Sequence, residues 1–88
     1  MVKEAPGLEF PCAFPVKVMV ENGPSSRREV LDLAARHASF SRSRDVRFRA
    51  SRNGRFESIT INIRAESRQQ LEALYRALND LDVVKMML

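Results

Sequence analysis

The strongest structural signal in this chain lies at residues 46–63, which read VRFRASRNGRFESITINI. Apolar residues alternate with arginines from Val46 to Ala50, and three isoleucines alternate with polar residues at the other end. Such alternation is typical of a β-strand with one buried face. Between the two strands, the pair Asn53-Gly54 tolerates the positive φ angles of tight turns. The segment therefore predicts an antiparallel hairpin.

One residue of this hairpin breaks the alternation. Phe56 has the wrong parity for the face that carries Ile59, Ile61 and Ile63. Either a β-bulge intervenes near Glu57, or the Phe56 ring lies on the opposite side of the sheet. The sequence leaves both alternatives open.

The hairpin is flanked by two predicted amphipathic helices, each of which begins at a capping box. In this motif a serine side chain accepts a hydrogen bond from the backbone three residues on. The two motifs are Ser26 with Glu29 and Ser67 with Gln70. Apolar residues then recur with the spacing of one helix face, so each helix is expected to cover a core. The stripes are Val30, Leu33, Ala34 and His37 in the first helix and Leu71, Leu74, Tyr75 and Leu78 in the second.

Strands are also predicted at both ends of this arrangement, at residues 14–20 and 83–88. The element order is then β-α-β-β-α-β. Two right-handed βαβ crossovers joined by a hairpin give an α+β ferredoxin-like fold. Its four-stranded antiparallel sheet has the order 4-1-3-2, and both helices lie on one face. We expect residues 10–88 to form this single domain, after a flexible leader at residues 1–9.

Composition argues against several classes of protein. Apolar residues make up 44% of the chain and charged residues 30%, as in ordinary globular domains. No apolar run approaches the roughly 20 residues of a membrane span, and the first residues lack the apolar stretch of a secretory signal. We expect a cytoplasmic protein without membrane contact. One cysteine and one histidine leave no disulfide and no zinc-type cluster, so neither a metal nor a cofactor is expected.

Nothing in the sequence points to catalysis. The one histidine, His37, falls on the apolar stripe of a helix, where a packed side chain is expected. Cys12 has no positive neighbour that would lower the pKa of its thiol. The three glycines stand too far apart to form a phosphate-binding loop. The sequence therefore favours a protein that is not an enzyme.

Positive charge is concentrated in the middle of the chain. Nine arginines and three acidic residues lie at positions 27–55, whereas the whole chain has a net charge of +4. Such asymmetry is usually solvated surface, but it can mark a polyanion-binding face. RNA-recognition domains share the βαββαβ order, and Arg47 and Arg49 would supply phosphate contacts. The polar residues between the isoleucines cannot stack on bases, so RNA binding is kept as the alternative function.

The side of the sheet away from the helices is the leading candidate site. Met19 and Met87 are expected there on adjacent strands, where they would leave adaptable apolar area exposed unless a partner covers it. We therefore expect a homodimer or another protein partner at this face. The predicted interaction face comprises Lys17, Met19, Arg47, Arg49, Thr60, Asn62, Lys85 and Met87.

The turn before the first helix is a second candidate. Free N–H groups at a helix start could receive the carboxylate or phosphate of a small-molecule effector. Ordinary helix capping explains a serine at this place equally well. The predicted ligand-binding residues are Asn22, Gly23, Ser25 and Ser26.

Short motifs occur in a defined order along the chain after the leader. They are Phe10-Pro11, Phe14, Lys17-Val18-Met19, Arg36-His37-Ala38, Ser58-Ile59-Thr60-Ile61, Tyr75 and Val84-Lys85-Met86-Met87-Leu88. In order and spacing they resemble the YbeD-like family of small bacterial proteins. The resemblance implies a ferredoxin-like fold of the type seen in ACT regulatory domains, which bind small ligands, often amino acids, at subunit interfaces.

The same resemblance implies no established activity. Genes of the family often lie beside those of lipoate attachment, which hints at that pathway. The family usually has glycine directly after the Lys-Val-Met motif, whereas this chain has Val20 there and its glycine at Gly23. This departure weakens the case for a ligand pocket near that loop. We expect a non-enzymatic regulatory, ligand-sensing or interaction module, with an RNA-binding accessory protein as the alternative.

Overall fold

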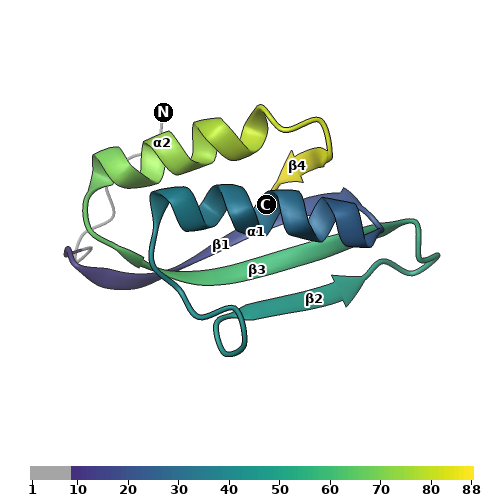
Figure 1. Ribbon diagram of the computed structural model, residues 1–88, viewed down its shortest axis with the longest axis horizontal. Coiled ribbons are helices and arrows are strands. Elements are labelled where there is room, and N and C mark those ends of the chain that lie inside the picture. The colour runs from purple at the N-terminus through teal and green to yellow at the C-terminus, as the bar shows by residue number, and fades with distance from the viewer. Residues whose placement is uncertain (1–8) are drawn as a thin grey trace.

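The computed structural model describes residues 9–88. Four antiparallel strands form one sheet in the order β2-β3-β1-β4, and both helices cover the same face of it (Figure 1). This order is 4-1-3-2 counted from the other edge, so the predicted ferredoxin-like α+β fold is confirmed. The elements are β1 (Cys12–Glu21), α1 (Pro24–His37), β2 (Val46–Ala50), β3 (Phe56–Ala65), α2 (Arg68–Asn79) and β4 (Val84–Met87).

The predicted leader, residues 1–9, lies outside the described residues apart from Glu9. Neither α1 nor α2 is long and apolar enough to cross a membrane, and these are the two helices of residues 9–88.

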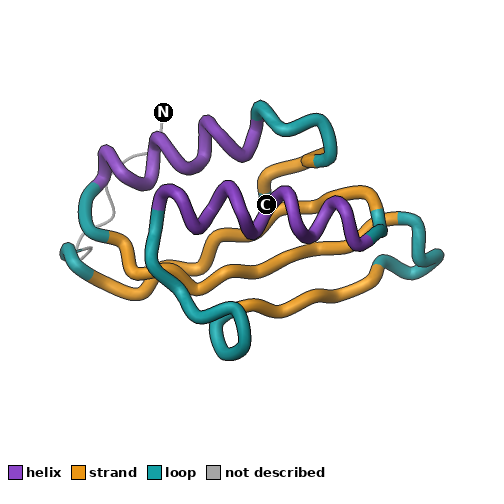
Figure 2. Tube along the Cα trace, in the orientation of Figure 1, coloured by secondary structure: helices purple, strands orange, loops and turns teal. Residues whose placement is uncertain are grey.

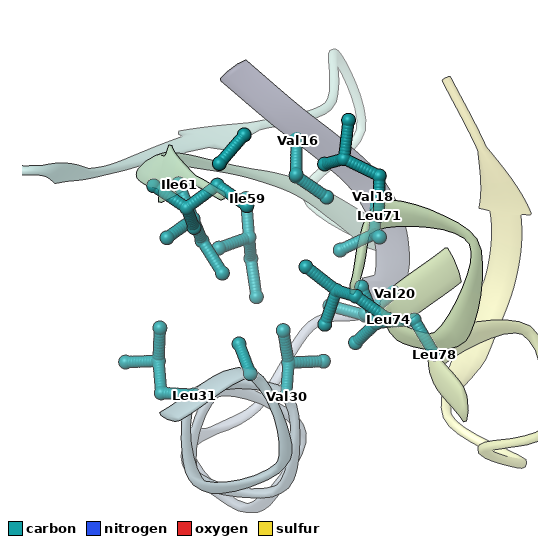
Figure 3. Packing of buried hydrophobic residues seen from close by; sticks show 13 residues of the cluster. Val16, Val18, Val20, Val30, Leu31, Ile59, Ile61, Leu71, Leu74 and Leu78 are labelled. Carbon is teal, nitrogen blue, oxygen red and sulfur yellow. The ribbon is translucent and has the colours of Figure 1, made fainter. Parts of the chain in front are cut away.

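The core lies between the helices and the covered face of the sheet. Val30 and Leu31 point from α1 toward Ile59 and Ile61 of β3 (Figure 3). Alternate residues of β1 and β3 are buried, as the sequence pattern predicts. Each helix also buries one stripe, but Leu33 and His37 of the stripe predicted for α1 and Tyr75 of that predicted for α2 are only half-buried. The buried cluster comprises Val16, Val18, Val20, Val30, Leu31, Ala34, Ile59, Ile61, Ile63, Ala65, Leu71, Leu74 and Leu78.

The β2–β3 hairpin closes as predicted, with one difference in its turn. The Gly54 N–H donates to the Ser51 carbonyl at 2.9 Å, and the Ser51 N–H donates to the Phe56 carbonyl at 2.8 Å. Gly54 alone adopts a positive φ, of 74°, whereas Asn53 does not. The Asn53 side chain instead accepts a hydrogen bond from the Arg55 N–H at 3.0 Å. The loop projects from one end of the sheet (Figure 2).

The first predicted capping box is wrong, because α1 begins three residues earlier than a cap at Ser26 would place it. Gly23 is the N-cap, and no side chain caps the helix. Pro24 follows in the first turn, where its missing N–H costs no hydrogen bond and its fixed φ suits a helix. Ser26 therefore lies inside the helix and is buried, with an exposed fraction of 5%.

The second capping box is present in part. The Ser67 hydroxyl accepts a hydrogen bond from the Gln70 N–H at 3.0 Å, as predicted. The Gln70 side chain does not return to Ser67 but accepts from the Glu66 N–H at 2.6 Å. Its amide also donates to the His37 carbonyl at 2.9 Å. Gln70 thus joins the start of α2 to the end of α1.

The structure settles the side of the sheet on which Phe56 lies. The pairing of β1 with β3 runs without interruption from Cys12 opposite Ala65 to Glu21 opposite Phe56, so there is no bulge near Glu57. Phe56 consequently lies on the side opposite the isoleucines. Glu57 takes the core side and is buried, with an exposed fraction of 3%.

Candidate interaction face

The side of the sheet away from the helices, hereafter the outer face, has its side chains fixed by strand register. Lys17 of β1 and Arg47 of β2 each pair with Thr60 of β3, which lies between them. These three side chains form one row across the sheet, because directly opposite residues project to the same side. Thr60, a small polar residue, therefore has one cation on each side.

A second row lies next to the first and changes character along its length. Arg49 of β2 pairs with Ser58 of β3, Ser58 pairs with Met19 of β1, and Met19 pairs with Met86 of β4. The row therefore runs from a cation at β2 to two methionines at β1 and β4. The outer face is basic toward one edge of the sheet and apolar toward the other.

Six of the eight predicted interaction-face residues lie on the outer side as expected. Their positions follow from pairing opposite outer-side neighbours and from alternation with the buried valines and isoleucines. These residues are Lys17, Met19, Arg47, Arg49, Thr60 and Asn62.

The predicted placement of Met87 on this face is wrong. Met87 pairs with the buried Val18 and packs against the core, and Met86 takes the outer position beside Met19. A β-bulge is responsible, since the register between β1 and β4 shifts between Met19 and Val20. Because β4 has one extra residue at this point, the residues after the bulge point to the opposite side of the sheet from the one that simple alternation predicts. A methionine therefore does lie beside Met19, but it is Met86, which is 54% exposed.

Lys85 lies in the bulge, so no strand pairing fixes its predicted position on the outer face. Val20 pairs with Val84 and Met19 with Met86, which leaves Lys85 as the extra residue. Its ammonium group donates to the Asp82 carbonyl at 3.0 Å and lies 3.7 Å from a Glu21 carboxylate oxygen. The Lys85 side chain therefore contacts residues at the end of the sheet.

Some cations of the chain form ion pairs with carboxylates, whereas those in the two rows of the outer face do not. Arg27, Arg42 and Arg64 each contact a carboxylate. Among residues 9–88, the side chains of Lys17, Arg47 and Arg49 make no such contact and are exposed. Their charge is free to meet an outside molecule.

An open depression lies where the basic and apolar parts of the outer face meet. Met19 and Leu88 contribute apolar surface to it, and Arg49 and Arg52 contribute positive charge. The Leu88 N–H donates to the Lys17 carbonyl at 3.0 Å, which holds the last residue beside β1. A molecule in this depression would contact apolar and cationic groups together.

At the second predicted site, the turn before α1, polar groups form hydrogen bonds within the protein. The Asn22 amide donates to the Gly54 carbonyl at 2.8 Å and so joins the end of β1 to the hairpin loop. The Gly23 carbonyl accepts from the Arg27 N–H at 3.3 Å, and Ser26 is buried in α1. Ser25 is exposed. A ligand at this turn stays a prediction.

The groups considered for catalysis are spread over the molecule. Cys12, at the start of β1, packs against the core, and His37 is half-buried at the end of α1. Two acidic residues at the start of α2 or just before it, Glu66 and Glu72, are not poised for catalysis either, because each pairs with a nearby arginine. Within residues 9–88, no three histidine, cysteine or acidic residues gather in a way that could hold a metal ion.

A cluster around one buried carboxylate, at the start of α1, was not anticipated from the sequence. Glu57 is the buried acidic residue of β3, and it accepts two hydrogen bonds from Arg27. The Arg27 guanidinium also lies 4.0 Å from the centre of the Phe48 ring in β2. The sequence did contain one signal of the burial of Glu57, because Glu57 alternates in phase with the three buried isoleucines of the same strand.

Comparisons with known proteins identify relatives of this chain by sequence. Residues 5–88 match the model of a family described as "Protein of unknown function (DUF493)". A UPF0250 protein of Vibrio vulnificus is 42% identical over 81 residues, covering 92% of this chain and 86% of the relative. A UPF0250 protein of Nitrosomonas europaea is 38% identical over 81 residues, covering 92% and 93%.

One solved structure shows the same fold at low sequence identity. The solution structure of protein HP0495 from H. pylori superposes with a TM-score of 0.73 at 20% identity. The match covers 97% of this chain and 89% of that one.

Proposed function

The chain belongs to the DUF493 (UPF0250) family of small bacterial proteins, and we propose that it is a non-enzymatic interaction module that binds an acidic segment of a protein partner. The YbeD-like resemblance seen in the sequence is thereby confirmed. The family description assigns no function, so the proposal is based on the outer face of the sheet.

The observation that carries the proposal is the set of cations without ion pairs on this face. Lys17, Arg47 and Arg49 project from two strands of a sheet side that no helix covers (Figure 1). Arginine presents a forked set of donors that matches carboxylates, and complementary charge guides and orients an acidic partner. Met19 and Met86 add adaptable apolar area beside the cations.

The shape of this face favours a protein over a small ligand or RNA. Small-molecule sites usually enclose most of the ligand, whereas the depression beside Met19 and Arg49 is open. RNA-binding sheets stack bases on aromatic side chains of the central strands. Here the outer positions of β1 and β3 next to Arg47 and Arg49 carry Lys17, Thr60 and Ser58 instead. Phe56 is an outer-side aromatic of β3, but it lies at the end of the strand, where Arg55 is 5.6 Å from the centre of its ring.

Charge also argues against a homodimer formed by two outer faces. A twofold contact brings the same patch of both subunits together. Lys17, Arg47 and Arg49 would then face the same three cations across the interface, which is unfavourable without counterions. Sedimentation of the protein at high concentration tests self-association directly.

A second candidate function follows from the composition of the depression. A small anion with an apolar tail would satisfy Met19 and Leu88 together with Arg49 and Arg52. Such an effector would give the regulatory role that the YbeD-like resemblance implies. A thermal-shift screen of amino acids and lipoyl compounds tests it, because a ligand at a hundred times its Kd raises the unfolding free energy by about 2.7 kcal/mol.

The main proposal is tested with a short blocked peptide in which glutamate alternates with valine, followed by fluorescence anisotropy. Replacing Lys17, Arg47 and Arg49 together by alanine is expected to weaken binding by about tenfold or more. The matched control replaces Arg28, Arg36 and Arg76, three exposed arginines of the helices, and is expected to change binding by less than about threefold, mainly through net charge. Equal losses in both variants would contradict a specific face. Tighter binding of a single-stranded RNA than of the peptide would favour the RNA alternative instead.

A further inference from the structure

The free edge of β2 offers backbone hydrogen-bonding groups in a definite pattern. Within residues 9–88, β2 ends the sheet and pairs only with β3. The Ser51 N–H donates to the Phe56 carbonyl, and the Asn62 N–H donates to the Asp45 carbonyl, each at 2.8 Å. Hydrogen-bonded pairs alternate along an antiparallel ladder, so every second residue between these positions bonds to β3. The others direct their N–H and C=O groups to the free edge, and these are Val46, Phe48 and Ala50.

The side chains along this edge alternate in chemistry as well as in direction. Arg47 and Arg49 project to the outer face, whereas Phe48 projects to the helix side. Phe48 is 39% exposed, because the helices pack mainly over the other strands and Arg27 covers only one side of the ring. The edge therefore presents two cations on one side and an exposed aromatic ring on the other.

We propose that an extended segment of the protein partner adds to β2 as a fifth, antiparallel strand. The segment alternates acidic and apolar residues, with the acidic side chains beside Arg47 and Arg49 and an apolar side chain against Phe48. Backbone hydrogen bonds supply affinity in this mode of recognition, and the alternating side chains supply specificity. The inference depends on the proposed function, since it gives the acidic partner a backbone conformation and a position.

The same edge is poorly suited to a second copy of this chain. Antiparallel pairing of two β2 strands about Phe48 would set each Arg47 opposite an Arg49. Like charges directly opposite each other destabilise a strand pair, and charged residues on edge strands discourage self-association. An acidic strand removes this repulsion and replaces it with two ion pairs.

The hydrogen-bond pattern permits a test that separates strand addition from simple charge attraction. In an antiparallel added strand, the residues opposite Phe48 and its edge-facing neighbours direct their N–H groups toward β2. These are the valines of the alternating peptide, because they lie on the helix side with Phe48. N-methylation of the valines removes these donors, whereas N-methylation of the glutamates removes donors that face away. The two modified peptides have the same charge and composition.

The protein binds the valine-methylated peptide about tenfold or more weaker than the glutamate-methylated one if the strand forms. Hydrogen exchange at the amides of Val46, Phe48 and Ala50 also slows when the unmodified peptide is bound, while exchange at Arg47 and Arg49 changes little. Equal affinities together with unchanged exchange would overturn strand addition. If peptide binding still requires Arg47 and Arg49 in that case, the proposed acidic partner is supported but strand addition is rejected. If the protein binds none of the peptides, both proposals are rejected.

Discussion

Arg27 and Glu57 join the first turn of α1 to β3 through two hydrogen bonds. The Arg27 Nε donates to Glu57 Oε1 at 2.9 Å, and its Nη2 donates to Oε2 at 2.6 Å. Glu57 is buried, whereas the Arg27 side chain is 45% exposed. The hydrogen bond to Glu57 raises the pKa of Arg27 above its ordinary value. Because the guanidinium also lies over Phe48, one arginine connects α1, β2 and β3.

This asymmetry predicts which half of the pair matters more for stability. Arg27→Ala leaves a buried carboxylate without its partner and is expected to lower Tm by about 10 °C. Glu57→Leu leaves an arginine that can turn to water, so its effect is expected to be smaller. Arg28→Ala, an exposed neighbour on α1, serves as the control and changes Tm by less than about 3 °C. Thermal unfolding followed by circular dichroism ranks the three, and a larger loss from Glu57→Leu would contradict the assignment.

Gly54 is expected to be sensitive to substitution for a backbone reason alone. Its φ is 74°, and an added Cβ would meet no atom within 4 Å. Gly54→Ala is therefore expected to cost about 1 kcal/mol of unfolding free energy through strain in the left-handed region. Arg52→Ala, in the same loop, is expected to change the unfolding free energy by less than about 0.5 kcal/mol. Urea unfolding measures both, and equal values would show that the turn does not require glycine.

The bulge in β4 predicts unequal roles for two adjacent methionines. Met87 packs against the core, whereas Met86 is 54% exposed beside Met19. Met87→Ala is expected to cost about 1–2 kcal/mol, and Met86→Ala less than about 0.5 kcal/mol. Urea unfolding of the two variants reports the register of β4. The reverse order would mean that β4 pairs with β1 without the bulge.

Tyr75 offers a spectroscopic test of the packing of α2. Burial raises the pKa of its phenol above the ordinary value of 10.0. The chain has one tyrosine and no tryptophan, so phenolate absorbance during alkaline titration reports Tyr75 alone. The midpoint is expected at a higher pH in the folded protein than in urea.

The raised pKa of Tyr75 also links stability to pH. The unfolded phenol loses its proton first, so this contribution is complete below pH 10 and is lost as pH rises through the folded pKa. Tyr75→Phe removes the linkage, and its unfolding midpoint in urea is expected to fall less steeply at alkaline pH than that of the wild type. Identical pH profiles would contradict the assignment.

Local periodicity was enough to predict most of the fold. The alternation around the isoleucines and valines placed β1 and β3, and the spacing of leucines placed α2. These segments are predictable because each must bury one regular face. The turn at Gly54 was predictable because positive φ favours glycine.

The features that the sequence did not predict depend on contacts between distant segments. The bulge at Lys85 is a property of β1 and β4 together, and no local pattern records which residue is left unpaired. The start of α1 was misplaced because Gly23 and Pro24 compete with Ser26 for the helix start. Glu57 has core parity, but the arginine that neutralises it lies 30 residues away along the chain.

The central claim is that the outer face, together with the edge of β2, receives an acidic partner. Chemical-shift mapping of the isotope-labelled protein with the alternating glutamate–valine peptide tests this claim most directly. The account predicts that the largest shifts occur at Lys17, Arg47, Arg49 and their strand neighbours and diminish as salt is added. Shifts centred on the exposed arginines of α1, or spread evenly over all basic residues, would contradict it.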